Sequence, residues 1–322
     1  MTTIDEATFE HGGASYYSKT WTIAVVLTAA ELQPQGVPVK AKLVFVHGFS
    51  EHINRYNDFF PQLAKHGIQI LSWDQRGWGR SVSKPWQKGL TGPTSEVVAD
   101  VAAFVRDKFS VADSEGTAAS RLPVFVMGHS MGGGEILTLA GDEKYADLVG
   151  RVRGWILESP FVGFSPGAAP SSLTIFAGRL AGRLLPRQQM KHVVTPELLT
   201  RDAEVVASVR DDPLCHDTGT LEGLASMLDR TEMLSSGRVK FGKQVRSILL
   251  THGTGDGICS CDAAVKFVEG QDAVGDKTLK LYDGAYHQLH SDHCKEDFTK
   301  DVADWILQRC GEKEDEQLEA KL

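Results

Sequence analysis

The feature that most constrains this chain of 322 residues is a serine between two glycines, in the segment Gly128-His-Ser130-Met-Gly132. A short apolar run at residues 122–127 precedes the segment, and apolar residues at helical spacing follow it. Strand, tight turn and helix in that order, with a serine at the turn, form the context that a G-x-S-x-G nucleophile elbow requires. The glycines let the backbone reverse sharply and leave the serine exposed in a strained conformation. We therefore predict that Ser130 is a catalytic nucleophile.

A second match to the same pattern, Gly163-Phe-Ser165-Pro-Gly167, is predicted to be a loop. Pro166 follows this serine directly, and proline has no backbone N–H to donate to an oxyanion. Another proline, Pro170, lies a few residues downstream, so a regular helix cannot start directly after the serine. Ser165 is therefore predicted to be a loop serine.

The rest of the chain alternates between apolar runs and segments with helical spacing of apolar residues. The runs predict strands at residues 42–46, 68–73, 122–127, 152–157, 246–250 and 278–282. The helical spacing predicts helices at residues 57–66, 94–109, 131–140, 263–269 and 294–309. Such alternation implies an α/β fold with a mostly parallel sheet that helices cover on both faces.

This alternation stops in the middle of the chain, where a helical pattern continues without a convincing core strand. We predict that residues 16–159 and 244–310 form the core of an α/β-hydrolase fold. Residues 160–243 are predicted to be a helical cap over the carboxyl ends of the strands, where open α/β sheets place their sites. The polar residues 1–15 and the charged residues 311–322 are predicted to be flexible termini.

Charge and composition exclude several classes of protein. A net charge of −8 argues against nucleic acid as a partner and against attraction to anionic headgroups. No apolar run reaches the roughly 18 residues of a membrane-spanning helix, and an acidic N-terminus argues against a secretory signal. The five cysteines indicate reduced thiols in a cytoplasmic protein, and Cys259-Ser-Cys261 lacks the spacing of a zinc site.

A nucleophilic serine needs a general base, which a carboxylate in turn orients. In the α/β-hydrolase order of serine, acid and histidine, only His287, His290 and His293 lie beyond every strong acid. His287 directly follows the last predicted strand and is the predicted base. Asp256 follows the preceding strand, has a glycine on each side and is the predicted acid. Asp262 is the alternative acid, although the pattern places it on the following helix.

Two backbone amides are predicted to form the oxyanion hole. Gly48 lets the chain turn after an early strand, so that the amide of Phe49 faces the elbow. The amide of Met131 is the second donor. His47 and His129 are predicted to brace the loop and the elbow by hydrogen bonds. This chemistry needs no metal and no organic cofactor.

Three stretches of this sequence resemble the monoacylglycerol lipases, a family of α/β hydrolases. Residues 47–56, HGFSEHINRY, look like the family's HGxxEHxxRY element. Residues 128–133, GHSMGG, are similar to its elbow, and residues 283–290, DGAYHQLH, are similar to its terminal histidine loop. The resemblance extends from about Trp21 to Arg309, and its first and third stretches are more selective than the elbow.

The resemblance implies hydrolysis of monoacylglycerols through an acyl-enzyme intermediate, with the cap as a lid. It places Glu51, Arg55 and His290 at positions that contact the glycerol headgroup. The alternative is that Glu51 and Arg55 pair with one another on a surface turn. Ser50 stands where the family often has glycine, and Val209 stands where some members have tyrosine, so headgroup selectivity is open.

Two other functions remain as alternatives. A lysophospholipase or a general carboxylesterase would use the same catalytic residues on another long-chain ester. A non-catalytic binding module would have lost a residue of the triad or the oxyanion hole, and this chain has lost none.

The predicted cap contains an amphipathic segment at residues 171–186. One helical face is apolar, and three arginines flank it at intervals of four residues. The apolar face consists of Leu173, Phe176, Ala177, Leu180 and Leu184, and the arginines are Arg179, Arg183 and Arg187. Two interpretations are open. The helix lies peripherally in a membrane or lipid-droplet surface, or it is a lid packed on the core.

Overall fold

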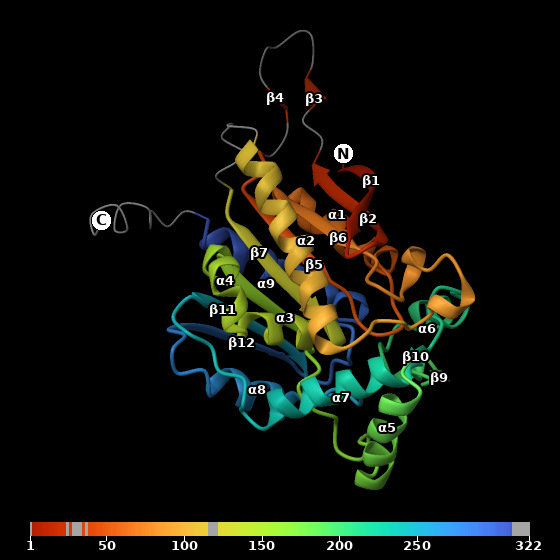
Figure 1. The fold of residues 1–322 in the computed structure, drawn as a ribbon. Coiled ribbons are helices and arrows are strands. Elements are labelled where there is room, and N and C mark those ends of the chain that lie inside the picture. Colours follow the sequence, from red (N-terminus) through yellow and green to blue (C-terminus); the bar gives the residue numbers. More distant parts are fainter. Residues whose placement is uncertain (1, 24–25, 28–33, 36–37, 115–121, 311–322) are drawn as a thin grey trace.

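The computed structural model describes residues 2–23, 26–27, 34–35, 38–114 and 122–310, and a single eight-stranded sheet forms its centre (Figure 1). The strand order is β1-β2-β6-β5-β7-β8-β11-β12. The strands are β1 (Thr2–His11), β2 (Ala14–Ile23), β5 (Ala41–Val46), β6 (Ile68–Trp73), β7 (Val124–His129), β8 (Gly154–Glu158), β11 (Ser247–Gly253) and β12 (Asp276–Tyr282). The strands from β6 to β12 in this order are parallel, whereas β1 and β2 are antiparallel to their neighbours.

Helices cover both faces of this sheet, as the alternation predicts. They are α1 (Phe59–Lys65), α2 (Thr94–Ser114), α3 (Met131–Ala140), α4 (Ala146–Arg151), α8 (Cys261–Glu269) and α9 (Lys295–Gln308). In Figure 1, α2 and α3 lie in front of the sheet and α1 and α9 lie behind it. Side chains of β5 alternate between the two apolar cores, since Leu43 and Phe45 pack with α1 and α9, and Val44 and Val46 pack with α2 and α3. The α/β-hydrolase fold with a mostly parallel sheet is confirmed.

The prediction of a flexible N-terminal arm is wrong for residues 2–11, which form the edge strand β1. Two glycines join β1 to β2, and both have positive φ, 57° at Gly12 and 73° at Gly13. A two-residue turn of this kind favours a tight hairpin. The polar composition of β1 hid the strand because most of its side chains face solvent. The prediction for residues 311–322 lies outside the described residues.

Between β8 and β11 the chain forms three α-helices, a short 3-10 helix (Pro196–Leu198) and a small antiparallel sheet. The helices are α5 (Ser172–Leu184), α6 (Ala203–Arg210) and α7 (Leu221–Ser235), and the sheet pairs β9 (Gln189–Lys191) with β10 (Thr218–Thr220). Figure 1 shows these elements gathered at one end of the molecule. The small sheet was not predicted, because strands of three residues leave no periodic pattern. The division at residues 160 and 243 stays a prediction.

Among the described residues, no helix combines the length and the apolar character that crossing a bilayer requires.

Candidate active site

Ser130 lies between β7 and α3, at the sharp turn that the sequence predicts. Its backbone has φ 52° and ψ −117°, a conformation that residues other than glycine rarely adopt. The flanking glycines make this turn sterically feasible. A Cβ on Gly128 would lie 2.5 Å from the carbonyl oxygen of Gly132, and one on Gly132 would lie 2.5 Å from the carbonyl oxygen of His47. The elbow is therefore packed directly against the end of β5.

The structure brings Ser130, His287 and Asp256 into one hydrogen-bonded chain. Ser130 Oγ lies 2.8 Å from His287 Nε2, and His287 Nδ1 lies 2.8 Å from Asp256 Oδ2. All three side chains are buried. His287 can therefore accept the proton of the serine hydroxyl at Nε2 while it donates its Nδ1 proton to the carboxylate.

The carboxylate of Asp256 is held in place by the backbone of its own loop. Its Oδ1 accepts the amides of Ile258 (2.8 Å) and Cys259 (3.0 Å), and His252 Nε2 lies 3.1 Å from Oδ2. Burial works to raise the pKa of Asp256, but the neighbouring His287 and His252 lower it well below its usual range. Burial works to lower the pKa of His287, but Asp256 raises it well above its usual value. Asp262, the alternative acid, lies on α8.

Ser165 does not contact the base, and it is a loop residue as predicted. Its hydroxyl lies 2.6 Å from the carbonyl oxygen of Asp256 and 3.0 Å from that of Cys259. The side chain therefore anchors the loop that carries the acid. Neither this role nor that of His252 has a local sequence signal, because both depend on contacts between distant segments.

Gly48 lies against the nucleophile, and His47 orients the next peptide unit. A Cβ on Gly48 would lie 3.2 Å from Ser130 Cβ. His47 Nε2 accepts the amide of Gln75 (2.9 Å), so its proton is on Nδ1, which donates to the carbonyl oxygen of Gly48 (2.8 Å). This carbonyl and the N–H of Phe49 point in opposite directions, because they belong to one trans peptide. This arrangement is compatible with an oxyanion hole formed by the amides of Phe49 and Met131. The oxyanion hole remains a prediction.

Glu51 is buried and holds two loops together, so the alternative of a surface pair with Arg55 does not apply. Its Oε2 accepts the amide of Gly48 (2.9 Å) and the hydroxyl of Tyr56 (2.7 Å), and its Oε1 accepts the side-chain amide of Gln288. Burial works to raise the pKa of Glu51, but nearby histidines and the Tyr56 hydroxyl lower it to about 2. Glu51 thus links the Gly48 loop to the loop of the base.

The other two residues predicted to contact the headgroup differ in position. Arg55 lines the cavity beside Ser130, and its guanidinium reaches the predicted cap at Ser208 Oγ (2.7 Å) and Asp212 Oδ2 (3.4 Å). His290 is not among the described residues that line this cavity. Its Nδ1 lies 2.7 Å from Glu158 Oε1, in a buried cluster behind the elbow. His290 therefore does not line the cavity in this structure, and its headgroup contact stays a prediction.

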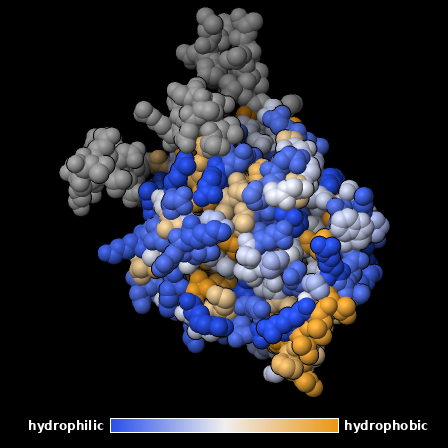
Figure 2. All heavy atoms as spheres, viewed as in Figure 1, coloured by the Kyte–Doolittle hydropathy of each residue, from blue (hydrophilic) through white to orange (hydrophobic). Residues whose placement is uncertain are grey.

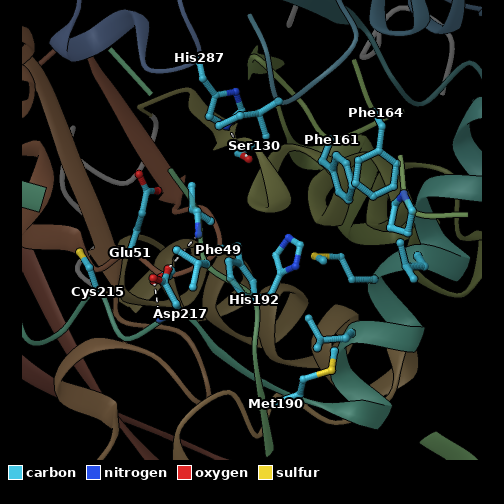
Figure 3. Close-up of a pocket in the computed structure, with 18 of the residues that line it drawn as sticks. Phe49, Glu51, Ser130, Phe161, Phe164, Met190, His192, Cys215, Asp217 and His287 are labelled. Carbon is cyan, nitrogen blue, oxygen red and sulfur yellow. Dashed lines mark hydrogen bonds between the residues drawn. The ribbon is translucent and has the colours of Figure 1, made fainter. Parts of the chain in front are cut away.

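Ser130 and His287 open into a cavity of about 890 Å³ between the sheet and the predicted cap. Figure 3 shows Phe161 and Phe164 beside the two residues, with His192 and Met190 on the opposite side. Further apolar side chains from α5 and α7 complete this wall, namely Leu173, Ala177, Ala181, Leu224 and Leu228. The cavity can hold a long acyl chain next to the nucleophile.

Three groups of described side chains have potential metal-ligand atoms within 4.8 Å of one another. They are Asp256, Cys259 and His287; His129, Glu158 and His290; and His52, Asp212 and Cys215. In the first group the base and the acid already bond to each other, and burial raises the pKa of the Cys259 thiol, which favours its protonated form. Acyl transfer by the serine needs no ion at any of these positions.

The elbow, the hydrogen-bonded serine, histidine and aspartate, and the sheet that carries them define a serine hydrolase of the α/β-hydrolase class. The family model described as "Serine aminopeptidase, S33" matches residues 37–293. A putative monoglyceride lipase of Schizosaccharomyces pombe is 32% identical over 301 residues, which span 92% of this chain and 72% of the relative. The monoglyceride lipase of Rattus norvegicus is 30% identical over 261 residues, which span 81% and 79%. This chain belongs to that S33 family, and monoglyceride lipases are among its relatives.

Solved structures agree on the fold. A soluble variant of monoglyceride lipase from Saccharomyces cerevisiae, in complex with a substrate analog, superposes with a TM-score of 0.82 at 22% identity, over 96% of each chain. The monoacylglycerol lipase of Paleococcus ferrophilus gives a TM-score of 0.70 at 26% identity, over 85% of this chain and 96% of the other. The resemblance inferred from the three sequence stretches is thereby confirmed.

Proposed function

We propose that this protein hydrolyses monoacylglycerols to a fatty acid and glycerol, with Ser130 as the nucleophile. The observation that carries the proposal is the hydrogen-bonded chain from Ser130 through His287 to Asp256, at the wall of a large cavity with apolar lining. The printed names of the relatives, several of which are monoglyceride lipases, support the substrate class.

The geometry supports an acyl-enzyme mechanism. As Ser130 Oγ attacks the ester carbonyl, His287 takes the hydroxyl proton and Asp256 stabilises the imidazolium. The amides of Phe49 and Met131 stabilise the negative oxygen of the tetrahedral intermediate. This intermediate expels glycerol, which receives its proton from His287. A water molecule, deprotonated by the same histidine, then attacks the acyl-enzyme and releases the fatty acid.

The apolar and polar parts of the cavity orient the substrate. The acyl chain lies along Phe161, Phe164 and the inner side of α5 and α7, where water is displaced from apolar surface. The glycerol lies near Arg55 and Glu51, which both line the cavity and remain the candidates for headgroup contacts. Glu51 also holds this end of the cavity together, because its carboxylate oxygens accept internal hydrogen bonds.

A side-by-side assay tests the substrate class. The purified chain is given 1- and 2-monoacylglycerol, diacylglycerol and lysophosphatidylcholine with the same acyl group, and kcat/KM is measured for each. We expect the monoacylglycerols to be preferred. A preference for lysophosphatidylcholine would favour the lysophospholipase alternative, and equal values for every ester would favour a general carboxylesterase.

The helix α5 supports a second part of the proposal, a peripheral contact with a lipid surface. Three of its apolar side chains are exposed and do not line the cavity: Phe176 is 66% exposed, Leu180 49% and Leu184 72%. Figure 2 shows them as an apolar patch at the end of the molecule where Figure 1 places α5. This exposure argues against a lid whose apolar face is buried on the core. Arg179 is engaged with Asp229 and Glu232 of α7 and does not belong to the rim of the patch.

A further inference from the structure

Ser50, directly after the predicted oxyanion donor Phe49, has a backbone conformation that costs energy. Its φ is 56°, in the left-handed region that favours glycine and disfavours a residue with a Cβ. Its side chain is only 5% exposed. A strained residue of this kind persists only where surrounding contacts hold it in place.

The contact that holds Ser50 comes from the predicted cap. Ser50 Oγ accepts the backbone amide of Asp217 at 2.8 Å. Asp217 is itself left-handed, with φ 52°, and its carbonyl oxygen accepts the amide of His192 at 2.7 Å. Residues 189–192 and 216–220 contain the antiparallel strands β9 and β10, which pair although α6 lies between them in the sequence. These two segments are called the cap hairpin below. One hydrogen bond therefore joins two strained residues, one from the core and one from the cap hairpin.

The side chain of Phe49 is held by the same two parts of the molecule. Its ring meets Trp78 of the core edge to face, with centroids 4.8 Å apart, and His192 of the cap hairpin at 5.9 Å. Trp78 in turn stacks on His216 of the cap hairpin, with centroids 4.9 Å apart and planes within 9°. Figure 3 shows Phe49, Asp217 and His192 together along one side of the cavity. The cap hairpin thus fixes both Phe49 and the residue that follows it.

We propose that Ser50 is a positioning residue that makes the Phe49 oxyanion donor depend on the docked cap hairpin. The inference rests on the proposed function. When the hairpin is docked, the hydroxyl of Ser50 keeps the loop in its left-handed turn, with the Phe49 amide directed at the reaction centre. When this hydrogen bond is lost, Ser50 relaxes toward negative φ and the loop that carries the donor moves. The cap hairpin therefore controls stabilisation of the transition state in addition to enclosing the acyl chain.

Two substitutions of Ser50 separate the hydrogen bond from the strain. Ser50→Ala removes the acceptor and keeps the cost of a Cβ at φ 56°, whereas Ser50→Gly removes both. Removal of a whole oxyanion donor costs about 10²–10³ in kcat, so a displaced donor in Ser50→Ala should cost roughly 10-fold or more on a soluble p-nitrophenyl ester. KM should stay within about 2-fold, since ground-state contacts are unchanged. Ser50→Gly should recover part of the loss, because glycine adopts the turn without strain.

Ser235→Ala is the matched control, because the hydroxyl of Ser235 is exposed and bonds to the Glu232 carbonyl of its own helix. It should leave kcat and KM unchanged. Melting temperatures of all variants show whether each one is folded. A kcat for folded Ser50→Ala equal to that of the unmodified chain overturns the inference.

Inhibitor affinities distinguish positioning from a general loss of structure. A long-chain trifluoromethyl ketone forms a tetrahedral adduct on Ser130 whose oxyanion occupies the hole, whereas a 1-O-alkylglycerol ether binds without one. In Ser50→Ala, affinity for the ketone should fall in parallel with kcat/KM, and affinity for the ether should stay unchanged. Equal losses for both ligands would overturn the positioning role. If monoacylglycerol is not hydrolysed but Ser50→Ala lowers kcat on the p-nitrophenyl ester, the proposed substrate fails and this inference stands.

Discussion

At the scale of single residues, the site depends on side chains that hold loops as much as on those that react. Asp256 illustrates this, since its Oδ1 accepts two amides of its own loop and its Oδ2 is shared by two histidines. The carboxylate is thereby fixed in the orientation that His287 needs. The same holds for Glu51, which joins the loops of Gly48 and Gln288.

The raised pKa of His287 predicts the pH dependence of the reaction. Only neutral His287 can accept the serine proton, and its pKa lies above the ordinary 6.5, so kcat/KM should rise with pH through a midpoint above 6.5. In Asp256→Asn the charge that raises this pKa is gone and burial remains, so the midpoint should move to lower pH. The rate should also fall by on the order of 10⁴.

The measurement is kcat/KM on a soluble ester across pH for both proteins. Asp262→Asn, on α8, serves as the control and should keep the profile of the unmodified chain. If kcat/KM of Asp256→Asn rises with the same pH midpoint as that of the unmodified chain, the pairing of acid and base is contradicted.

Ser165 provides a test of loop anchoring at the residue scale. Ser165→Ala removes the hydroxyl that donates to the carbonyl oxygens of Asp256 and Cys259. This loss should lower the free energy of unfolding by about 1–3 kcal/mol. Activity should stay within roughly tenfold of that of the unmodified chain, because the reacting groups remain. Chemical denaturation and kcat report the two effects, with exposed Ser236→Ala as control. Complete loss of activity in folded Ser165→Ala would contradict the assignment of the nucleophile.

At the scale of elements, α5 exposes an apolar surface that no other described residue covers. Because the chain carries a net charge of −8, adsorption to lipid must come from apolar burial rather than from attraction to anionic headgroups. Replacement of Phe176 and Leu184 by Asp, at two exposed positions that do not line the cavity, should weaken binding to vesicles and slow hydrolysis of aggregated substrate. Activity on a soluble short-chain ester should be preserved.

The control for α5 is Leu281→Asp, on β12, where the leucine is also exposed but lies outside the α5 patch. It should leave vesicle binding unchanged. If the α5 variant loses as much activity on the soluble ester as on aggregated substrate, and also melts at a lower temperature, its apolar residues stabilise the fold and do not contact lipid.

The six strands and five helices that the sequence predicts all occur to within a few residues, because long apolar runs and helical spacing survive in the sequence, whereas the short helix α4 was not predicted. The edge strand β1 was missed since its side chains are mostly polar, although Gly12 and Gly13 were a hairpin signal. The residues of the triad follow from strand ends and chain order. Neither His252 nor Glu158 could be found in this way, because each acts only through a tertiary contact.

His290 shows the limit of transferring a role by motif. The spacing to His287 is that of the family's loop, yet buried Glu158 at the end of β8 draws the ring of His290 away from the cavity. The carboxylate of Glu158 is within hydrogen-bond distance of both the backbone amide and the ring of His290, and such charge-assisted hydrogen bonds hold the ring in place. Sequence spacing carries no information about this distant partner.

At the scale of the whole molecule, one buried ion pair and one partly exposed pair join the predicted cap to the core. Arg230 on α7 lies 3.4 Å from Glu135 on α3, the helix that follows the nucleophile. Arg55, beside the oxyanion loop, lies 3.4 Å from Asp212. Removing one partner of a buried pair leaves an uncompensated charge, so these contacts fix where the cap sits. The cavity, the loop of Gly48 and the exposed helix α5 are thus parts of one assembly.

The central claim is that this assembly cleaves monoacylglycerols through Ser130, and the most direct test is the kcat of Ser130→Ala on a monoacylglycerol. Loss of a triad nucleophile should lower kcat by on the order of 10⁶, with an unchanged melting temperature. A fluorophosphonate should label the unmodified chain at Ser130 and leave Ser130→Ala unlabelled. Folded Ser130→Ala that still hydrolyses monoacylglycerol at a substantial fraction of the original rate would contradict the account.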